Sequence, residues 1–214
     1  MRRWGKSTVD EVLGAVLFFA LCAAAMTAAG SYVQYGNIGA DYVLMTLQAA
    51  LGIAGMALMR RVDQKAKLAL PATFYSLFYG FLFCAVFLGE MLGFYYLVPL
   101  WDAALHCYSG VMLTYLGFHL AGQYALRRNI SVGAAEAAVF AACFSLALGA
   151  VWECYEYLMD GAFAMNMQKF AGESGMAFTG RGALSDTMED ILLDTAAAVT
   201  AAIVLWRRNL TRQG

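Results

Sequence analysis

Apolar residues occur along this chain in long runs that short polar segments separate. Six runs are about 20 residues long, at 12–30, 38–59, 69–90, 102–124, 132–157 and 188–206. Because a helix rises about 1.5 Å per residue, about 20 residues cross the ~30 Å core of a bilayer. The pattern therefore predicts an all-α membrane protein, in which a bundle of six transmembrane helices forms a single domain over residues 1–214.

The first run has two interpretations. MRRWGKSTVD is basic, and the following EVLGAVLFFALCAAAMTAAG has the apolar middle and the small-residue end of a signal peptide. The run is long, however, and Asp10 and Glu11 interrupt its approach, so we favour a helix that is retained. Cleavage would leave the orientation of the other five helices unchanged.

Composition agrees with a membrane setting and narrows the range of partners. Hydrophobic residues make up 62% of the chain and charged residues 14%, whereas a soluble domain is nearer half apolar and a quarter charged. No basic stripe with interleaved aromatic residues occurs, so nucleic acid is not an expected partner. The five cysteines include no C-x-x-C pair, which argues against a disulfide framework or a zinc knuckle. Membrane lipids are the expected partners.

Basic residues indicate how the helices are oriented. Twelve of the 14 Lys and Arg residues lie before the first run, between the second and third, between the fourth and fifth, or after the sixth. The positive-inside rule makes these segments cytoplasmic, and both termini with them. The other two, Lys169 and Arg181, lie in the longest outer segment, the loop 160–185.

Acidic residues gather at the opposite, outer end. Three runs carry polar residues there at spacings of three or four, which place them on one face of a helix. These residues are Asp102 and His106 in the fourth run, Glu153 and Glu156 in the fifth, and Asp186, Asp190 and Asp194 in the sixth. Glu90 ends the third run on the same side. Because a charge that faces lipid costs at least ~2.5 kcal/mol, we expect these stripes to face inward, around one acidic cavity that opens outward.

Such a cavity would hold seven carboxylates and one histidine, and like charges at close range cannot all stay ionised without compensation. Oxygen ligands with one imidazole suit a divalent ion such as Mg, Mn, Zn or Fe, and two neighbouring ions would balance the charge better than one. The expected metal ligands are Asp102, His106, Glu153, Asp186 and Asp190, with Asp194 and Arg181 as additional members. Glu156 or Glu90 would be the general base.

Simpler interpretations account for some of these residues. An acid that begins a helix, such as Asp102, can merely complement the helix dipole. Glu153 and Glu156 end a helix, where the dipole disfavours them, so capping does not explain them. An interfacial acid such as Asp160 is more simply solvated, and the lone His119 is more simply a packed residue.

Three segments follow one another between Gly89 and Ala198: GEMLGFYYLVPLWDAALHCYSGVML, WECYEY and GALSDTMEDILLDTAAA. Their order resembles that of the YjdF-like family of bacterial multi-pass inner-membrane proteins. That family has a Glu–Gly–Tyr stretch before D-x-x-x-H, then W-E-x-x-E, and then a Gly-led D-T/x-x-x-D.

The resemblance implies a multi-pass location in the inner (plasma) membrane, but it brings no established reaction. It selects Glu90, Gly93, Tyr96, Asp102, His106, Gly110, Glu153, Glu156, Asp186 and Asp190, and it adds Tyr96 to the candidate site. Ser185 and the alanines at 197–198 stand where many members have glycine, a departure that concerns helix packing more than chemistry.

Three classes of function fit these features. Acids confined to one side favour a metal-dependent membrane hydrolase or transferase that acts on a lipid, a lipid-linked group or another small molecule. A metal, cation or proton-coupled transporter is the alternative, because acids in membrane helices also mark ion paths. Beyond His119, however, no ladder of ionisable residues leads toward the cytoplasm. The third class is a non-catalytic membrane component whose acids only satisfy one another.

Overall fold

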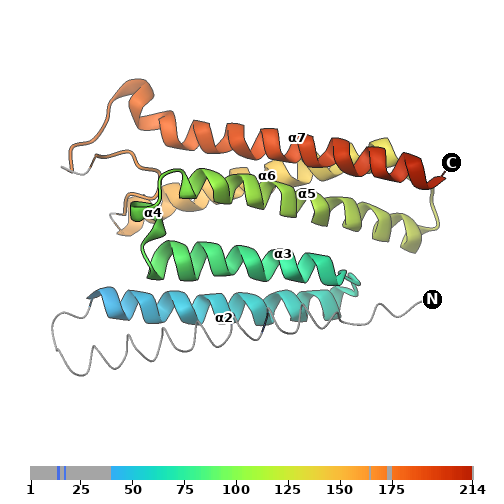
Figure 1. Ribbon diagram of the computed structural model, residues 1–214, viewed down its shortest axis with the longest axis horizontal. Coiled ribbons are helices and arrows are strands. Elements are labelled where there is room, and N and C mark those ends of the chain that lie inside the picture. Colours follow the sequence, from blue (N-terminus) through green and yellow to red (C-terminus); the bar gives the residue numbers. More distant parts are fainter. Residues whose placement is uncertain (1–13, 15–16, 18–39, 164, 173–174, 214) are drawn as a thin grey trace. The chain divides into compact units, whose positions relative to one another are not determined.

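The computed structural model describes residues 14, 17, 40–163, 165–172 and 175–213 (Figure 1). This part of the chain is all-α, and its one strand-like feature is an isolated bridge between Ala171 and Ala177. The elements are α2 (Ala40–Ala66), α3 (Ala72–Leu82), the π-helix η1 (Phe83–Met91), α4 (Phe94–Leu97), α5 (Trp101–Arg128), α6 (Ala134–Phe163), the 3-10 helix η2 (Gly180–Leu184) and α7 (Ser185–Gln213). The run 12–30, with its two interpretations, lies outside the described residues except at positions 14 and 17.

The chain forms two compact units, Met1–Leu105 and His106–Gly214. The boundary between them lies inside α5, which is one continuous helix. Asp102 therefore belongs to the first unit by packing, while the backbone of α5 carries it one turn before His106.

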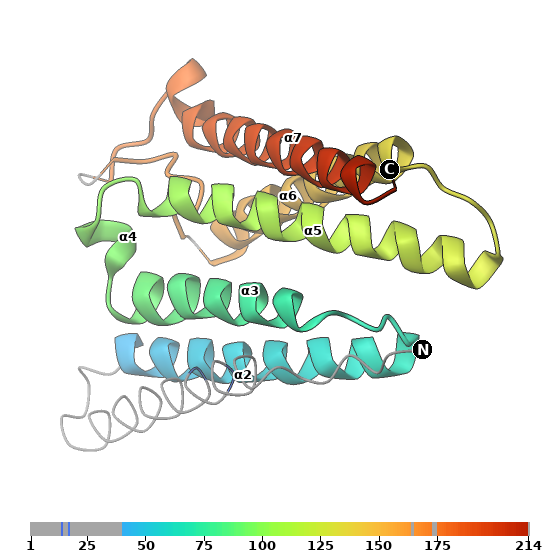
Figure 2. The ribbon, with the colours of Figure 1, turned by 45° about the vertical axis from the view of Figure 1, so that its right-hand side comes forward.

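In the first unit α2 and α3 lie side by side and antiparallel (Figures 1 and 2). A core cluster that includes Met56 and Tyr79 is packed between them. At one end of the pair, the Tyr79 hydroxyl accepts a hydrogen bond from Arg60 Nε at 2.7 Å. The helix that begins as α3 continues as η1 and ends at Met91. Gly93, which precedes α4, has a φ of +72°, a left-handed conformation that glycine adopts without strain.

In the second unit α5 and α7 run in one direction and α6 runs in the other (Figure 2). Small residues let these helices approach closely, as is common between membrane helices. The Ser145 hydroxyl donates to the Gly110 carbonyl at 3.1 Å, and a Cβ added at Gly110 would lie 2.9 Å from the Cβ of Ala197. This contact of α5 with both other helices lies one turn from His106, so it fixes how the polar ends of the helices meet.

Two helical segments in the described part of the chain are long and apolar enough to cross a membrane, Ala72–Met91 and Ala134–Phe163. The first consists of α3 and η1, and the second is α6. On α6 the side chains that face outward include Val139, Leu148 and Val151. Its buried side instead carries small and acidic residues, from Ala141 to Glu153. This is the distribution that lipid around the helix favours, apolar outside and polar inside.

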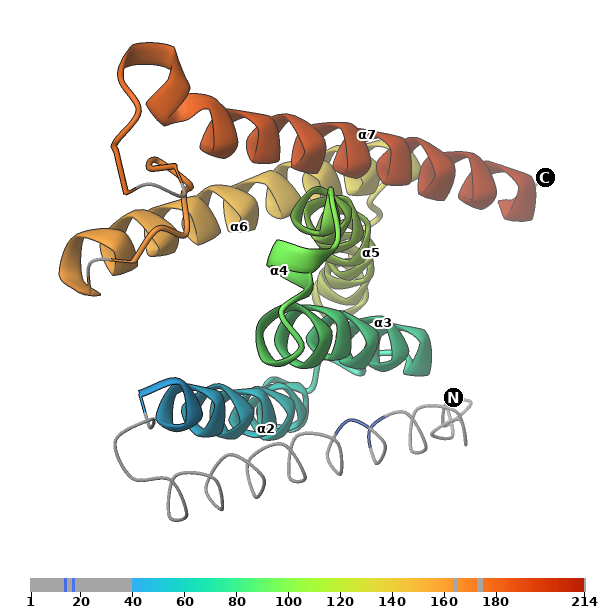
Figure 3. The ribbon, with the colours of Figure 1, turned by 60° about the vertical axis from the view of Figure 1, so that its left-hand side comes forward.

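The connection from α6 to α7 leaves the end of one helix and returns to the start of the other through η2 (Figure 3). Within it, the amide of Phe178 donates to the Phe170 carbonyl at 2.8 Å and the amide of Gly172 donates to the Met176 carbonyl at 3.1 Å. These bonds and the Ala171–Ala177 bridge hold residues 170–172 beside residues 176–178. The connection is therefore held by its own backbone hydrogen bonds.

Candidate functional site

The polar ends of α5, α6 and α7 meet at one end of the second unit. His106 lies near the start of α5, Glu153 is in the second half of α6, and Asp190 and Asp194 are on the first turns of α7. These positions lie at the same end because α5 and α7 run in one direction and α6 runs in the other. The starts of α5 and α7 are then beside the end of α6. The spacing expected from the sequence is met: the buried positions of α6 repeat every three or four residues and include Glu153, Glu156 and Asp160.

His106 lies between two carboxylates. Its Nε2 is 3.6 Å from Asp190 Oδ2, and its Nδ1 is 3.5 Å from Asp194 Oδ2. All three residues are nearly inaccessible, at 6%, 4% and 4% exposure. Asp194 is also 3.4 Å from the Ser109 hydroxyl, and its Oδ2 packs against the Cα of Gly149, where no side chain intervenes. The imidazole is thus held by an acid at each nitrogen.

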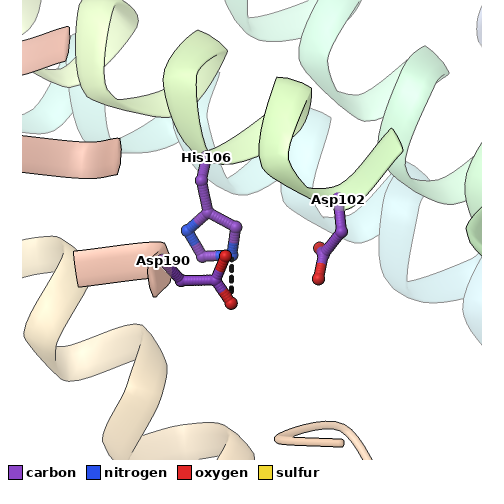
Figure 4. A group of neighbouring side chains, drawn as sticks. All are labelled: Asp102, His106 and Asp190. Atoms are coloured by element: carbon purple, nitrogen blue, oxygen red, sulfur yellow. Dashed lines mark ion pairs between the residues drawn. The ribbon is translucent and has the colours of Figure 1, made fainter. Parts of the chain in front are cut away.

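Asp102, His106 and Asp190 form a compact group of ligand atoms, all within 4.8 Å of one another (Figure 4). Asp102 and His106 are four residues apart on α5, so the helix backbone fixes their separation. Asp190 approaches from α7 on the Nε2 side of the ring. Asp102 is half-buried, whereas the other two are buried.

Glu153 is a buried carboxylate of α6 that lies beside His106. It is 5% exposed, and among the described residues neither of its oxygens has a hydrogen-bond partner of ordinary geometry. Its electrostatic neighbours are His106, Asp186 and Asp194, and the Thr187 hydroxyl is its polar neighbour. A buried carboxylate among other carboxylates is costly unless a cation or a proton compensates it.

Asp186 begins α7 and is paired with a residue of the α6–α7 connection. Lys169 Nζ lies 2.7 Å from Asp186 Oδ1, while the other oxygen, Oδ2, is buried. The side chain of Lys169 is 47% exposed and that of Asp186 17%. A hydrogen bond lies beside this ion pair. Gln168, the residue before Lys169, donates from Nε2 to the hydroxyl of Thr187, the residue after Asp186, at 2.9 Å.

The acids further along α6 are buried and hold other partners. Glu156 accepts a hydrogen bond from Trp152 Nε1 at 2.8 Å. Asp160 accepts from the backbone amides of Met167 at 2.7 Å and Gln168 at 3.0 Å. The expectation that Asp160 is merely solvated is wrong, because its carboxylate is buried and anchors the connection to the end of α6.

Of the remaining predicted site residues, Glu90, Tyr96 and Arg181 are exposed. Glu90 is exposed in the first unit and accepts from Gln48 Nε2 at 2.9 Å. Tyr96, on the short α4, is 92% exposed. Arg181 is exposed on η2. His119 is thirteen residues beyond His106 on α5 and about 20 Å from it along the helix axis.

Sequence reasoning missed the contribution of the α6–α7 connection. Lys169, Gln168 and Thr187 all touch the acids or one another, yet none was a candidate. One signal was available, because Lys169 and Arg181 are the two basic residues in the segments predicted to lie on the acidic, outer side. A cation retained among so many acids is a candidate partner for one of them.

The described part of the chain is thus an all-α structure with two helices suited to a membrane and a buried carboxylate–histidine cluster at one end of α5, α6 and α7. Residues 11–211 match the family described as Predicted membrane protein (DUF2238), so the chain belongs to that family. The resemblance to a family of membrane proteins is confirmed.

An uncharacterized protein of Thermotoga maritima is 27% identical to the chain over 126 residues, which are 58% of this chain and 57% of that protein. The chain therefore aligns with little more than half the length of this relative. No solved structure matches it.

Proposed function

We propose that this protein crosses the inner (plasma) membrane six times and binds a divalent metal ion at its outer end, where it acts on a lipid or lipid-linked substrate. The observation that carries the proposal is the environment of His106, which has a buried carboxylate at each ring nitrogen. The buried Glu153 lies beside it.

The six-span topology is supported by helix length and by the distribution of charge. The five long helical segments α2, α3 with η1, α5, α6 and α7 have 20 to 30 residues each, and the run 12–30 would supply the first span. About 20 residues suffice to cross the hydrocarbon core. With the termini and the basic segments on the cytoplasmic side, the cluster around His106 faces the outside.

The two nitrogens of His106 have different roles in this proposal. A histidine that binds a metal through one nitrogen commonly donates its other N–H to a carboxylate, which fixes the ring. The Nε2 side has Asp190 and Asp102 close by and would hold the ion. The Nδ1 side has Asp194, which would accept the N–H and orient the ring. Asp194 is then a positioning residue rather than a ligand.

The charge of the cluster supports a divalent ion over a proton alone. Five carboxylates belong to it: Asp102, Glu153, Asp186, Asp190 and Asp194. Lys169 and a protonated His106 would together neutralise two of them. Carboxylate oxygens with one imidazole suit Mg, Mn, Zn or Fe. Glu153 and Asp186 would complete the donor set.

A divalent ion bound at this place would polarise a phosphoryl or carbonyl oxygen and activate water. Glu156 lies one turn beyond Glu153 on the buried side of α6, so it is the favoured general base. Its hydrogen bond from Trp152 would hold the carboxylate in place. A hydrolase or transferase of this kind would meet its substrate in the outer leaflet, where the cluster lies in this topology.

The proposal is tested by melting the purified protein with and without a chelator, and with Mg, Mn, Zn or Fe restored. At a concentration 100 times its dissociation constant, a ligand of the folded state stabilises it by about 2.7 kcal/mol. We expect earlier melting after chelation and recovery with one of these metals.

Substitutions in the cluster separate a metal site from a hydrogen-bonded network. Asp102→Asn, His106→Ala, Glu153→Gln and Asp190→Asn should each weaken the recovery. The carboxylate variants should be at least as stable as the unaltered protein when both are free of metal, because repulsion is relieved. Glu136→Gln, at the exposed opposite end of α6, is the control. A melting curve that chelation leaves unmoved, with every cluster variant simply less stable, would show that the proposal is wrong.

A further inference from the structure

The C-terminal half of α2 carries a groove on the side of the helix that faces away from the core. Its volume is about 450 Å³, and its lining residues are Leu58, Arg61, Val62, Lys65 and Ala66. Leu58 is two residues beyond Met56, which belongs to the core cluster, and two residues turn a helix by about 200°. Sites for small molecules are typically ~300–1,000 Å³, so the groove is large enough for a lipid headgroup.

We infer that this groove binds one anionic phospholipid of the inner leaflet, with its phosphate on Arg61 and Lys65 and an acyl chain along Leu58 and Val62. The inference rests on the orientation given in the proposed function, because the positive-inside rule makes this end of α2 cytoplasmic. It does not rest on the metal site, which lies on other helices.

The first support is the pair of cations. Arg61 and Lys65 are one turn apart on α2, and both are exposed. A guanidinium forms paired hydrogen bonds with phosphate oxygens, and an ammonium adds a compact positive charge. Basic residues at the cytoplasmic end of a membrane helix attract the anionic lipids of that leaflet. The pair therefore complements a phosphate group.

The acid of the same segment faces another way. RRVDQKAK, residues 60–67, has four basic residues and one acid, Asp63. The carboxylate of Asp63 accepts a hydrogen bond from the Tyr75 hydroxyl at 2.7 Å and one from the Leu70 amide at 3.2 Å. Asp63 thus joins α2 to the start of α3, while the groove keeps its positive charge.

The second support is an apolar stripe that continues from the groove along α2. Leu51 and Leu58 are each 61% exposed, and Val62 is 41% exposed. These residues are seven and four positions apart, so they lie on one face of the helix. Gly55 lies on the same face, and a Cβ added there would have no atom within 4 Å. The stripe therefore leaves room beside Gly55 for an acyl chain.

The combination of charge and apolar surface favours a phospholipid over other occupants. A soluble phosphate would engage the two cations and leave the stripe uncovered. A zwitterionic lipid would cover the stripe, but its own positive group would weaken the attraction to the cations. The first six residues of the chain carry three basic residues and no acid, so they would be repelled by Arg61 and Lys65.

The test is a titration of the purified full-length protein, in nonionic detergent, with phosphatidylglycerol. Phosphatidylcholine of the same acyl chains and glycerol 3-phosphate are titrated in parallel. Native mass spectrometry counts the bound lipids, and the melting temperature follows their effect on stability. We expect one phosphatidylglycerol to bind more tightly than the rest and to raise the melting temperature. Phosphatidylcholine and glycerol 3-phosphate should do so only at much higher concentrations, and equal effects of the two lipids would overturn the inference.

Charge variants locate the site. Arg61→Gln and Lys65→Gln should each weaken the binding of phosphatidylglycerol about fivefold, because one basic residue near an anionic lipid contributes ~1 kcal/mol. Arg207→Gln is the matched control, since it removes the same charge from an exposed position near the end of α7. It should leave the affinity unchanged. If all three variants lose affinity equally, the lipid responds to overall charge and the groove is not a site.

A second pair of variants tests the apolar stripe. Gly55→Leu fills the space beside the stripe and should weaken phosphatidylglycerol binding, whereas Gly122→Leu on α5, where an added Cβ also meets nothing within 4 Å, should not. Equal affinities in the two variants would refute the path assigned to the acyl chain. Loss of lipid selectivity with the metal response intact would overturn this inference alone. Loss of the metal response with lipid selectivity intact would overturn the proposed metal site alone.

Discussion

Gly149 offers a direct test of the role assigned to Asp194. A Cβ added at this position would overlap Asp194 Oδ2 and would lie 3.3 Å from its Cγ. The nearest atom is the end of a rotatable side chain rather than backbone, so we expect the carboxylate to turn while the helices stay in place. Asp194 would then leave His106 Nδ1, from which it is now 3.5 Å.

The size of the effect can be estimated from the two consequences of Gly149→Ala. Loss of a carboxylate that orients a metal-binding histidine typically weakens metal affinity by about 10- to 100-fold, or ~1.4–2.7 kcal/mol. Replacing a glycine inside a helix by alanine favours the helix by roughly 0.5–1 kcal/mol. The variant should therefore be about as stable as the unaltered protein without metal, and clearly less stable with it.

The assay is thermal melting in detergent over a titration of Mn²⁺ or of the metal that restores stability. Gly161→Ala is the matched control, because it makes the same change on the same helix, with nothing within 4 Å of the new Cβ. The titration midpoint of Gly149→Ala should lie at a 10- to 100-fold higher metal concentration than that of Gly161→Ala. Equal midpoints in the two variants would refute the argument that Asp194 positions the histidine.

Three further predictions follow from the topology, the separation of the histidines and the anchoring of the α6–α7 connection. A cysteine introduced at Pro99 should react with an impermeant reagent added outside intact cells, and one at Asp63 should not; the reverse result would invert the proposed orientation. Turnover in detergent should survive His119→Ala and fail with Asp190→Asn if the protein is an enzyme with an outer site, whereas an equal loss of activity would favour a transport path along α5. Asp160→Ala leaves two backbone amides without their acceptor and should lower the free energy of unfolding by about 1–3 kcal/mol. Proteolysis between α6 and α7 should become faster, and unchanged proteolysis would show that this anchor is dispensable.

The sequence predicted the helical fold well, because long apolar runs report both burial in lipid and helix formation. For example, the apolar pattern predicted a helix at 132–157, and α6 covers Ala134–Phe163. The helix extends beyond the apolar run because hydropathy marks the membrane region, whereas hydrogen bonds continue into the interface. The change from α3 to the π-helix η1 at Phe83 had no sequence signal, since it depends on how the backbone is packed.

The cluster was only partly predictable. Spacing placed His106, Glu153 and Asp190 on inward-facing stripes, because residues three or four apart share a helix face. The contacts of Lys169 and Asp160 with distant partners were not predictable, because they depend on the path of a connection that has no periodicity. Periodicity thus predicts which side chains turn inward, but not which of them touch.

The distribution of the cluster over three helices has a consequence for biosynthesis. In the proposed topology the ribosome releases His106 first, then Glu153, and the three aspartates of α7 last. Until α7 arrives, the earlier helices would expose a histidine and an uncompensated glutamate to the translocon or to lipid. The acids of α7 would in turn disfavour its insertion unless those helices receive it. The ion would then bind only after α7 has packed against the earlier helices. A truncated chain without α7 should be a substrate for membrane proteases.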